Sequence, residues 1–178
     1  NSDAWHREQM NKEGEFSGKA CDNWRLFRED VQLINSLGHQ AYRYSIEWSR
    51  IEPDEGCFNQ LALDHYKEMS ELFKQLHIKT FVTLNHFTVP QWFAEKGGFH
   101  KRENISYFLR YVEKVVKALM GLADFYLIIN ESTHTKIDTR LGFNYLIAHA
   151  RAYRLIKSIC DVPVSSAHMA IQTFPYRY

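Results

Sequence analysis

The stretch Phe125-Tyr126-Leu127-Ile128-Ile129-Asn130-Glu131 decides the fold class of this chain. A continuous apolar run leads directly into an amide and a carboxylate. Such a run predicts a strand that is buried on both faces, as in a parallel sheet. A strand of this kind carries the residues after it to the carboxyl edge of the sheet, where α/β enzymes keep their catalytic groups. Glu131 is therefore a candidate general acid/base beside Asn130. The alternative is that both residues only begin a polar loop.

A unit of one helix followed by one strand repeats along the chain. Apolar residues spaced by three and four predict helices, and runs of aromatic and β-branched residues predict strands. We expect a loop over the first twenty residues and an irregular segment at 132–140. The predicted helices are 22–37, 63–76, 105–119 and 143–159, with a short turn of helix after Pro90, and the predicted strands are 41–48, 80–84, 125–129 and 162–168.

Alternating helices and strands imply parallel strands joined by right-handed crossovers, either in an open doubly wound sheet or in a (β/α)8 barrel. No Gly-rich phosphate turn follows an early strand, which argues against the doubly wound sheet. The first three strands instead end in Glu47, in Asn85 and His86, and in Asn130 and Glu131. A barrel needs eight strands and typically about 250 residues. We therefore expect residues 1–178 to form a single α/β domain that is about half of a (β/α)8 TIM barrel.

Composition excludes several classes of protein. The chain has 178 residues, 45% of them hydrophobic and 15% aromatic, so it has enough apolar material for a core. The 22 basic and 21 acidic residues are interspersed and give a net charge of +1. This balance predicts no nucleic-acid partner. Because no apolar run reaches the roughly 20 residues of a membrane helix, we expect no membrane partner either.

The cysteines and histidines indicate which cellular compartment the protein occupies and whether it binds a metal. Cys21, Cys57 and Cys160 are odd in number and far apart, which favours a reducing, cytoplasmic compartment over a disulfide framework. The polar first residues show no signal peptide, although a processed N-terminus would hide one. The nine histidines include no pair with metal-ligand spacing. We therefore expect no metal and no other cofactor.

Three motifs resemble glycoside hydrolase family 1, the β-glucosidase family. Residues 42–53, YRYSIEWSRIEP, resemble its second-strand signature, and residues 81–87 with Pro90 are similar to its third-strand motif. The pair Asn130-Glu131 matches its fourth-strand motif. Residues 18–22 and 148–152 are also similar to family stretches, so the likeness covers almost the whole chain in order.

The resemblance implies a role for each matching residue. Glu131 would be the general acid/base of a retaining β-glycosidase, and Asn130 would bind the sugar 2-hydroxyl. His86 would donate to sugar hydroxyls, or else be a structural histidine. Arg43 would point into the barrel at its carboxyl end and resemble the arginine that orients the catalytic nucleophile. Trp48 and Trp92 could stack on sugar rings, although packing is the commoner role of such residues.

Departures from the family pattern limit these expectations. Ser132 replaces the usual proline, Phe87 replaces the usual tryptophan, and the loop after Glu131 is short. The chain is expected to begin after the family's first strand and to end after its fifth, so the nucleophilic glutamate of the seventh strand has no counterpart. Without that partner, Arg43 would need another carboxylate. Glu47 is the internal candidate for a second catalytic carboxylate, because it shares a strand face with Arg43 and Ser45. An ion pair with a nearby arginine is its expected role.

Two hypotheses follow. The first is an enzyme of carbohydrate metabolism that hydrolyses terminal β-linked glycosides or oligosaccharides when complete, although this chain alone would be inactive. The second is an inactive half-barrel with a structural or weak sugar-binding role. Under either hypothesis, open barrel edges would favour self-association.

Overall fold

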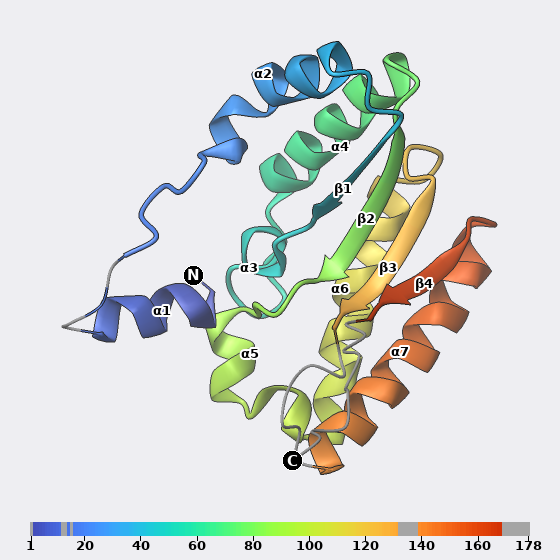
Figure 1. Cartoon of the computed structure of the whole chain (residues 1–178). Helices are drawn as coiled ribbons and strands as arrows, with labels where there is room; N and C mark the ends of the chain where they lie inside the picture. Colours follow the sequence, from blue (N-terminus) through green and yellow to red (C-terminus); the bar gives the residue numbers. More distant parts are fainter. Residues whose placement is uncertain (1, 12–13, 15, 132–138, 169–178) are drawn as a thin grey trace, which may run out of the picture.

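Four strands form one parallel sheet in the computed structural model, which describes residues 2–11, 14, 16–131 and 139–168. The strands are β1 (Ala41–Ser45), β2 (Lys79–Asn85), β3 (Phe125–Asn130) and β4 (Val164–Ala167), and their order in the sheet is β1-β2-β3-β4. The long helices are α2 (Asn23–Ser36), α4 (Gln60–Gln75), α6 (Ile105–Ala118) and α7 (Thr139–Ile159) (Figure 1). The shorter ones are α1 (Asp3–Met10), α3 (Trp48–Ile51), α5 (Gln91–Glu95) and two 3₁₀ turns, Gly98–His100 and Arg102–Asn104. This sequential parallel order confirms the predicted half-barrel.

The two faces of the sheet differ because side chains alternate along each strand. Tyr44, Val82 and Tyr126 are register partners, and all three are buried on the face that the long helices cover. Their sequence neighbours Phe81 and Phe125 point to the opposite face, where the two rings stack with centroids 4.3 Å apart. Arg43 is in register with Phe81 and shares this second face, which no long helix covers (Figure 1).

Helix α6 ties the carboxyl ends of two strands together. Its apolar stripe is buried, and Tyr111 within it is fully buried. The Tyr111 hydroxyl lies 2.9 Å from the carbonyl of Leu84 and 3.3 Å from that of Ile46. Burial raises the pKa of Tyr111 well above its ordinary value, so the hydroxyl remains a donor. This contact fixes the backbone from which the polar strand ends extend. Trp48 is also buried and stacks on Tyr111, which confirms a packing role for this tryptophan.

Three predicted boundaries are wrong. Asp3–Met10 is a helix rather than a loop, because Ser2 caps its N-terminus and Asp3 pairs with Arg7 one turn later. The strand predicted at 41–48 ends at Ser45, and α3 begins at Trp48. Helix α7 begins at Thr139 rather than at 143, and residues 132–138 of the predicted irregular segment lie outside the described residues.

Both lateral edges of the sheet are open within the described part of the chain. β1 and β4 each have a strand neighbour on one side only. Leu33 in α2 and Leu37 at its C-terminus are exposed large apolar side chains. Phe143, Leu146 and Tyr153 form a second exposed apolar stripe on α7. No described helix is long and apolar enough to cross a membrane.

Candidate active site

The polar residues predicted at the strand ends meet at one edge of the sheet. β2 and β3 are adjacent and parallel, so His86 and Glu131, which follow them, lie at the same carboxyl edge. Glu131 has a φ of 47°, in the left-handed region, and its backbone N–H donates to the carbonyl of Ala167 at 2.7 Å. A non-glycine residue in this region costs about 1–2 kcal/mol. The β4 contact therefore holds the candidate acid/base in a conformation that it would not otherwise prefer.

Asn130 presents a buried donor at this edge. Only 3% of the residue is exposed, and its Oδ1 accepts a hydrogen bond from Arg43 Nη2. Its Nδ2 is buried and has no hydrogen-bond partner among the described residues. Leaving a buried donor unpaired costs about 1–3 kcal/mol. A ligand oxygen at this position would remove that cost.

The surroundings of Arg43 differ from the expected ones. The residue is exposed rather than buried, and its backbone lies in the middle of β1 rather than at the carboxyl end. Its long side chain reaches toward that end, where Nε donates to Thr83 Oγ1 at 2.9 Å and Nη2 donates to Asn130. Both partners are neutral. The expectation that Arg43 would need a second carboxylate is therefore wrong, because its charge stays close to water.

His86 is held through one ring nitrogen. Its Nδ1 lies 2.9 Å from Ser45 Oγ, at the end of β1. Partial burial lowers the pKa of His86, the positive charge of Arg43 lowers it further, and Glu131 opposes both effects. These effects favour the neutral form of the ring, and the contact through Nδ1 leaves Nε2 for a ligand. The sequence pattern placed Ser45 on the same face as Arg43 but gave no sign of this contact with His86.

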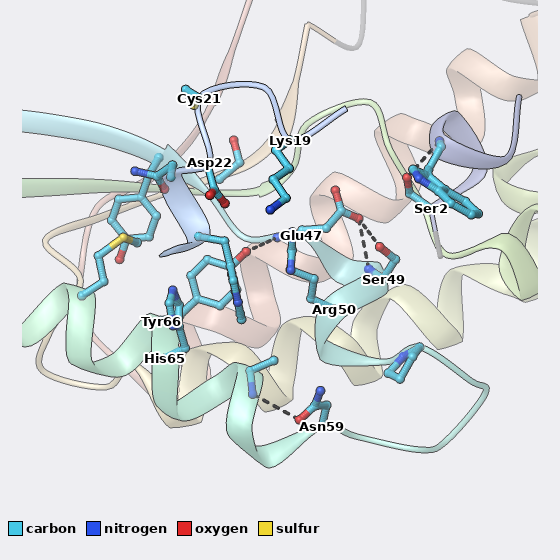
Figure 2. A pocket seen from close by; sticks show the side chains of 18 of the residues that line it. Ser2, Lys19, Cys21, Asp22, Glu47, Ser49, Arg50, Asn59, His65 and Tyr66 are labelled. Carbon is cyan, nitrogen blue, oxygen red and sulfur yellow. Dashed lines mark hydrogen bonds between the residues drawn. The ribbon is translucent and has the colours of Figure 1, made fainter. Parts of the chain in front are cut away.

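Glu47 is neither ion-paired nor free. Its Oε1 accepts from Ser49 N at 3.1 Å and from Ser49 Oγ at 2.7 Å, so it caps α3 (Figure 2). Its Oε2 accepts from Thr88 Oγ1 at 2.6 Å. Glu47 forms no ion pair within the described residues, so the expected pairing with an arginine is wrong. With both oxygens engaged, Glu47 is also a poor candidate for a second catalytic carboxylate.

A groove of 890 Å³ runs beside the open edge of β1 and is shown in Figure 2. It is lined by Lys19, Asp22, Arg50 and Tyr66, together with Glu47. Arg43, His86, Asn130 and Glu131 do not line this groove. The groove is therefore distinct from the cluster of these four residues, although Ser45, which contacts His86, lines it.

The described residues include no group of three or more His, Cys, Asp or Glu side chains placed to hold a metal ion. The structure thus brings together one carboxylate, one neutral histidine, one buried amide and one guanidinium. Such a group can bind hydroxyl groups and can deliver a single proton.

Comparisons with known proteins agree with this arrangement. Residues 1–140 match the family model described as Glycosyl hydrolase family 1. Beta-glucosidase A of Acetivibrio thermocellus is 28% identical, over 83% of this chain and 37% of that protein. The 6-phospho-beta-galactosidase of Clostridium acetobutylicum is 29% identical, over 94% of this chain and 40% of that protein.

A solved structure shows the same fold. The beta-glycosidase from Pyrococcus horikoshii superposes with a TM-score of 0.82 at 38% identity, over 93% of this chain and 43% of that one. The chain thus spans about two fifths of the length of the curated relatives it matches.

Proposed function

Because the chain belongs to glycosyl hydrolase family 1, we propose that it carries the acid/base part of a retaining β-glycosidase active site, with Glu131 as the general acid/base. The observation that carries the proposal is the meeting of Glu131, His86 and the unpaired Asn130 Nδ2 at one sheet edge. Chemistry from several strand ends at the carboxyl face is typical of the barrel fold.

Each residue has a distinct part in this reaction. Glu131 protonates the oxygen of the leaving group and afterwards takes a proton from the attacking water. Asn130 Nδ2 donates to the sugar 2-hydroxyl, a contact that strengthens in the transition state. The neutral His86 offers Nε2 to a second hydroxyl, while Arg43 holds Asn130 in place through Oδ1.

The substrate class follows from the relatives. Proteins named as beta-glucosidase and as 6-phospho-beta-galactosidase both share this segment. We therefore propose a terminal β-linked glycoside or oligosaccharide as the substrate of the complete protein. The three cysteines are unpaired, which is consistent with a cytoplasmic location.

A retaining mechanism also needs a nucleophilic carboxylate about 5–5.5 Å from the acid/base. The hydrogen bonds of Arg43, His86 and Asn130 among the described residues involve no carboxylate, and Glu47 is engaged elsewhere. The chain alone is therefore proposed to be inactive. The same observation favours the alternative function, a half-barrel with a structural or weak sugar-binding role.

The open edges of β1 and β4 support a further part of the proposal, self-association of the isolated chain. Unpaired strand edges and the exposed α7 stripe offer backbone and apolar partners to a second molecule.

The role of Glu131 is tested by Glu131→Gln in a complete, active version of the protein. Turnover should fall severely for substrates with basic leaving groups and much less for those whose leaving group needs no protonation, because acid assistance matters in proportion to leaving-group basicity. Glu113→Gln removes a carboxylate from the surface of α6 and is the matched control. Equal losses for good and poor leaving groups would show that Glu131 does not act as the acid.

A further inference from the structure

His86 lies on a short irregular segment between β2 and α5. Phe87 within this segment has a φ of 71°, and Thr88 N donates back to the carbonyl of His86 at 2.9 Å. Asn85 Nδ2 donates to the carbonyl of Thr88 at 3.0 Å. The backbone around the histidine is thus a tight turn whose far side is Thr88.

The Thr88 side chain joins this turn to the end of β1. Its hydroxyl donates to Glu47 Oε2 at 2.6 Å. A hydroxyl–carboxylate bond of this length is charge-assisted and roughly twice as strong as a neutral one. The turn that carries His86 is therefore held by a strong contact from a separate segment.

Glu47 is itself fixed in place. Ser49 occupies its other oxygen, and the Glu47 backbone N–H donates to the hydroxyl of the buried Tyr66 at 3.0 Å (Figure 2). Burial raises the pKa of Tyr66 to about 12, so the hydroxyl stays protonated. The carboxylate that Thr88 contacts is thus a rigid point in the fold.

We propose that Glu47 and Thr88 are positioning residues that set the place of the His86 ring in the sugar site, an inference that rests on the proposed function. The segment 45–47 contacts the turn twice, through Ser45 on the ring and through Glu47 on Thr88. Two contacts from one rigid segment determine both the position and the rotation of the imidazole. A misplacement of about 1 Å at such a site can cost on the order of 10²-fold in rate.

The test compares Thr→Val substitutions at two positions, Thr88 in the turn after β2 and Thr80 within β2. Thr88→Val removes the hydroxyl that donates a hydrogen bond to Glu47, and Thr88→Ser keeps this hydroxyl. Thr80→Val is the matched control, because Thr80 is 1% exposed and bonds through its hydroxyl at the opposite, amino end of β2. Glu47→Gln is a second variant that keeps the shape of the side chain.

The measurements use a complete version of the protein that carries Glu131→Gln, so that a β-linked sugar is bound but not hydrolysed. ¹⁵N NMR of the imidazole reports the tautomer and pKa of His86, and chemical-shift titration reports binding of cellobiose, a β-linked disaccharide. Thr88→Val and Glu47→Gln should change the His86 signals and weaken cellobiose binding about tenfold. Thr88→Ser and Thr80→Val should leave the His86 signals at the wild-type positions.

The outcomes separate this inference from the proposed function. Unchanged His86 signals in folded Thr88→Val and Glu47→Gln would overturn the positioning role. Shifted His86 signals with unchanged cellobiose affinity would support the positioning role and contradict the contact between His86 and sugar.

Discussion

The carboxylate of Glu52 is fully buried, and its removal is the sharpest test of how the fold is held together beneath the site. It accepts from Trp48 Nε1 at 3.0 Å, from Gly56 N at 2.8 Å and from the guanidinium of Arg110. The Arg110 side chain is 37% exposed, so one end of this ion pair reaches water. The segment 48–56 and helix α6 therefore meet at one buried charge.

The expected cost follows from these contacts. Glu52→Gln keeps one acceptor oxygen but replaces the other with an NH2 group, which faces a donor. The buried N–H that loses its acceptor costs about 1–3 kcal/mol. Loss of the partly solvated ion pair adds about 1 kcal/mol. We expect the free energy of unfolding to fall by about 2–4 kcal/mol. Arg110→Met should cost more, about 3–5 kcal/mol, because it leaves Glu52 as a buried charge without its partner.

The assay is urea unfolding followed by circular dichroism at two protein concentrations, which separates folding from association. The double variant of Glu52 and Arg110 should be less destabilised than the sum of the single variants. Glu113→Gln, which breaks only an exposed pair with Lys117, should cost no more than about 0.5 kcal/mol. A Glu52→Gln variant as stable as the Glu113→Gln control would refute the reasoning.

Two further predictions concern the isolated chain. In size-exclusion chromatography it should elute as oligomers or partly unfolded material, and a chromogenic β-glucoside assay should read near background, because the sheet edges are open and one carboxylate cannot be both acid and nucleophile. A well-folded monomer whose turnover is abolished by Glu131→Gln would contradict this. Burial lowers the pKa of His65 below its usual value of 6.5, so the unfolded state binds its proton more tightly. The free energy of unfolding should keep its full value above about pH 6.5 and should decrease as the pH drops below it. His65→Phe, which keeps the stack on Trp24, should flatten that loss in acid unfolding curves, whereas a substitution at the exposed His39 should not.

The order of elements was predictable because burial leaves a periodic signature. Helices α4 and α6 show apolar residues at helical spacing, and they form close to where that spacing predicted them. Helix α1 was missed because it buries no residue at all. Its only signals are the Ser2 cap and the Asp3–Arg7 pair, which the search for an apolar stripe does not register.

The end of β1 shows where alternation misleads. Ile46 and Trp48 continue the apolar pattern of the strand, and both are buried. Only Ile46 still pairs, through its N–H to the carbonyl of Thr83, and Glu47 then caps α3. Burial of alternate residues is the same whether the chain continues as a strand or turns into a short helix above the core, so the pattern could not separate the two.

Some features of the candidate site could be predicted from the sequence, and others could not. That His86 and Glu131 share one edge followed from the rule that the carboxyl ends of parallel strands meet. The state of Glu47 did not follow, because it depends on Thr88, 41 residues further along the chain. Seen in the sequence, Glu47 is a carboxylate on the face of Arg43 and a candidate for catalysis. In the fold, its oxygens accept hydrogen bonds from Ser49 and Thr88, and the role that we propose for it acts through the position of His86.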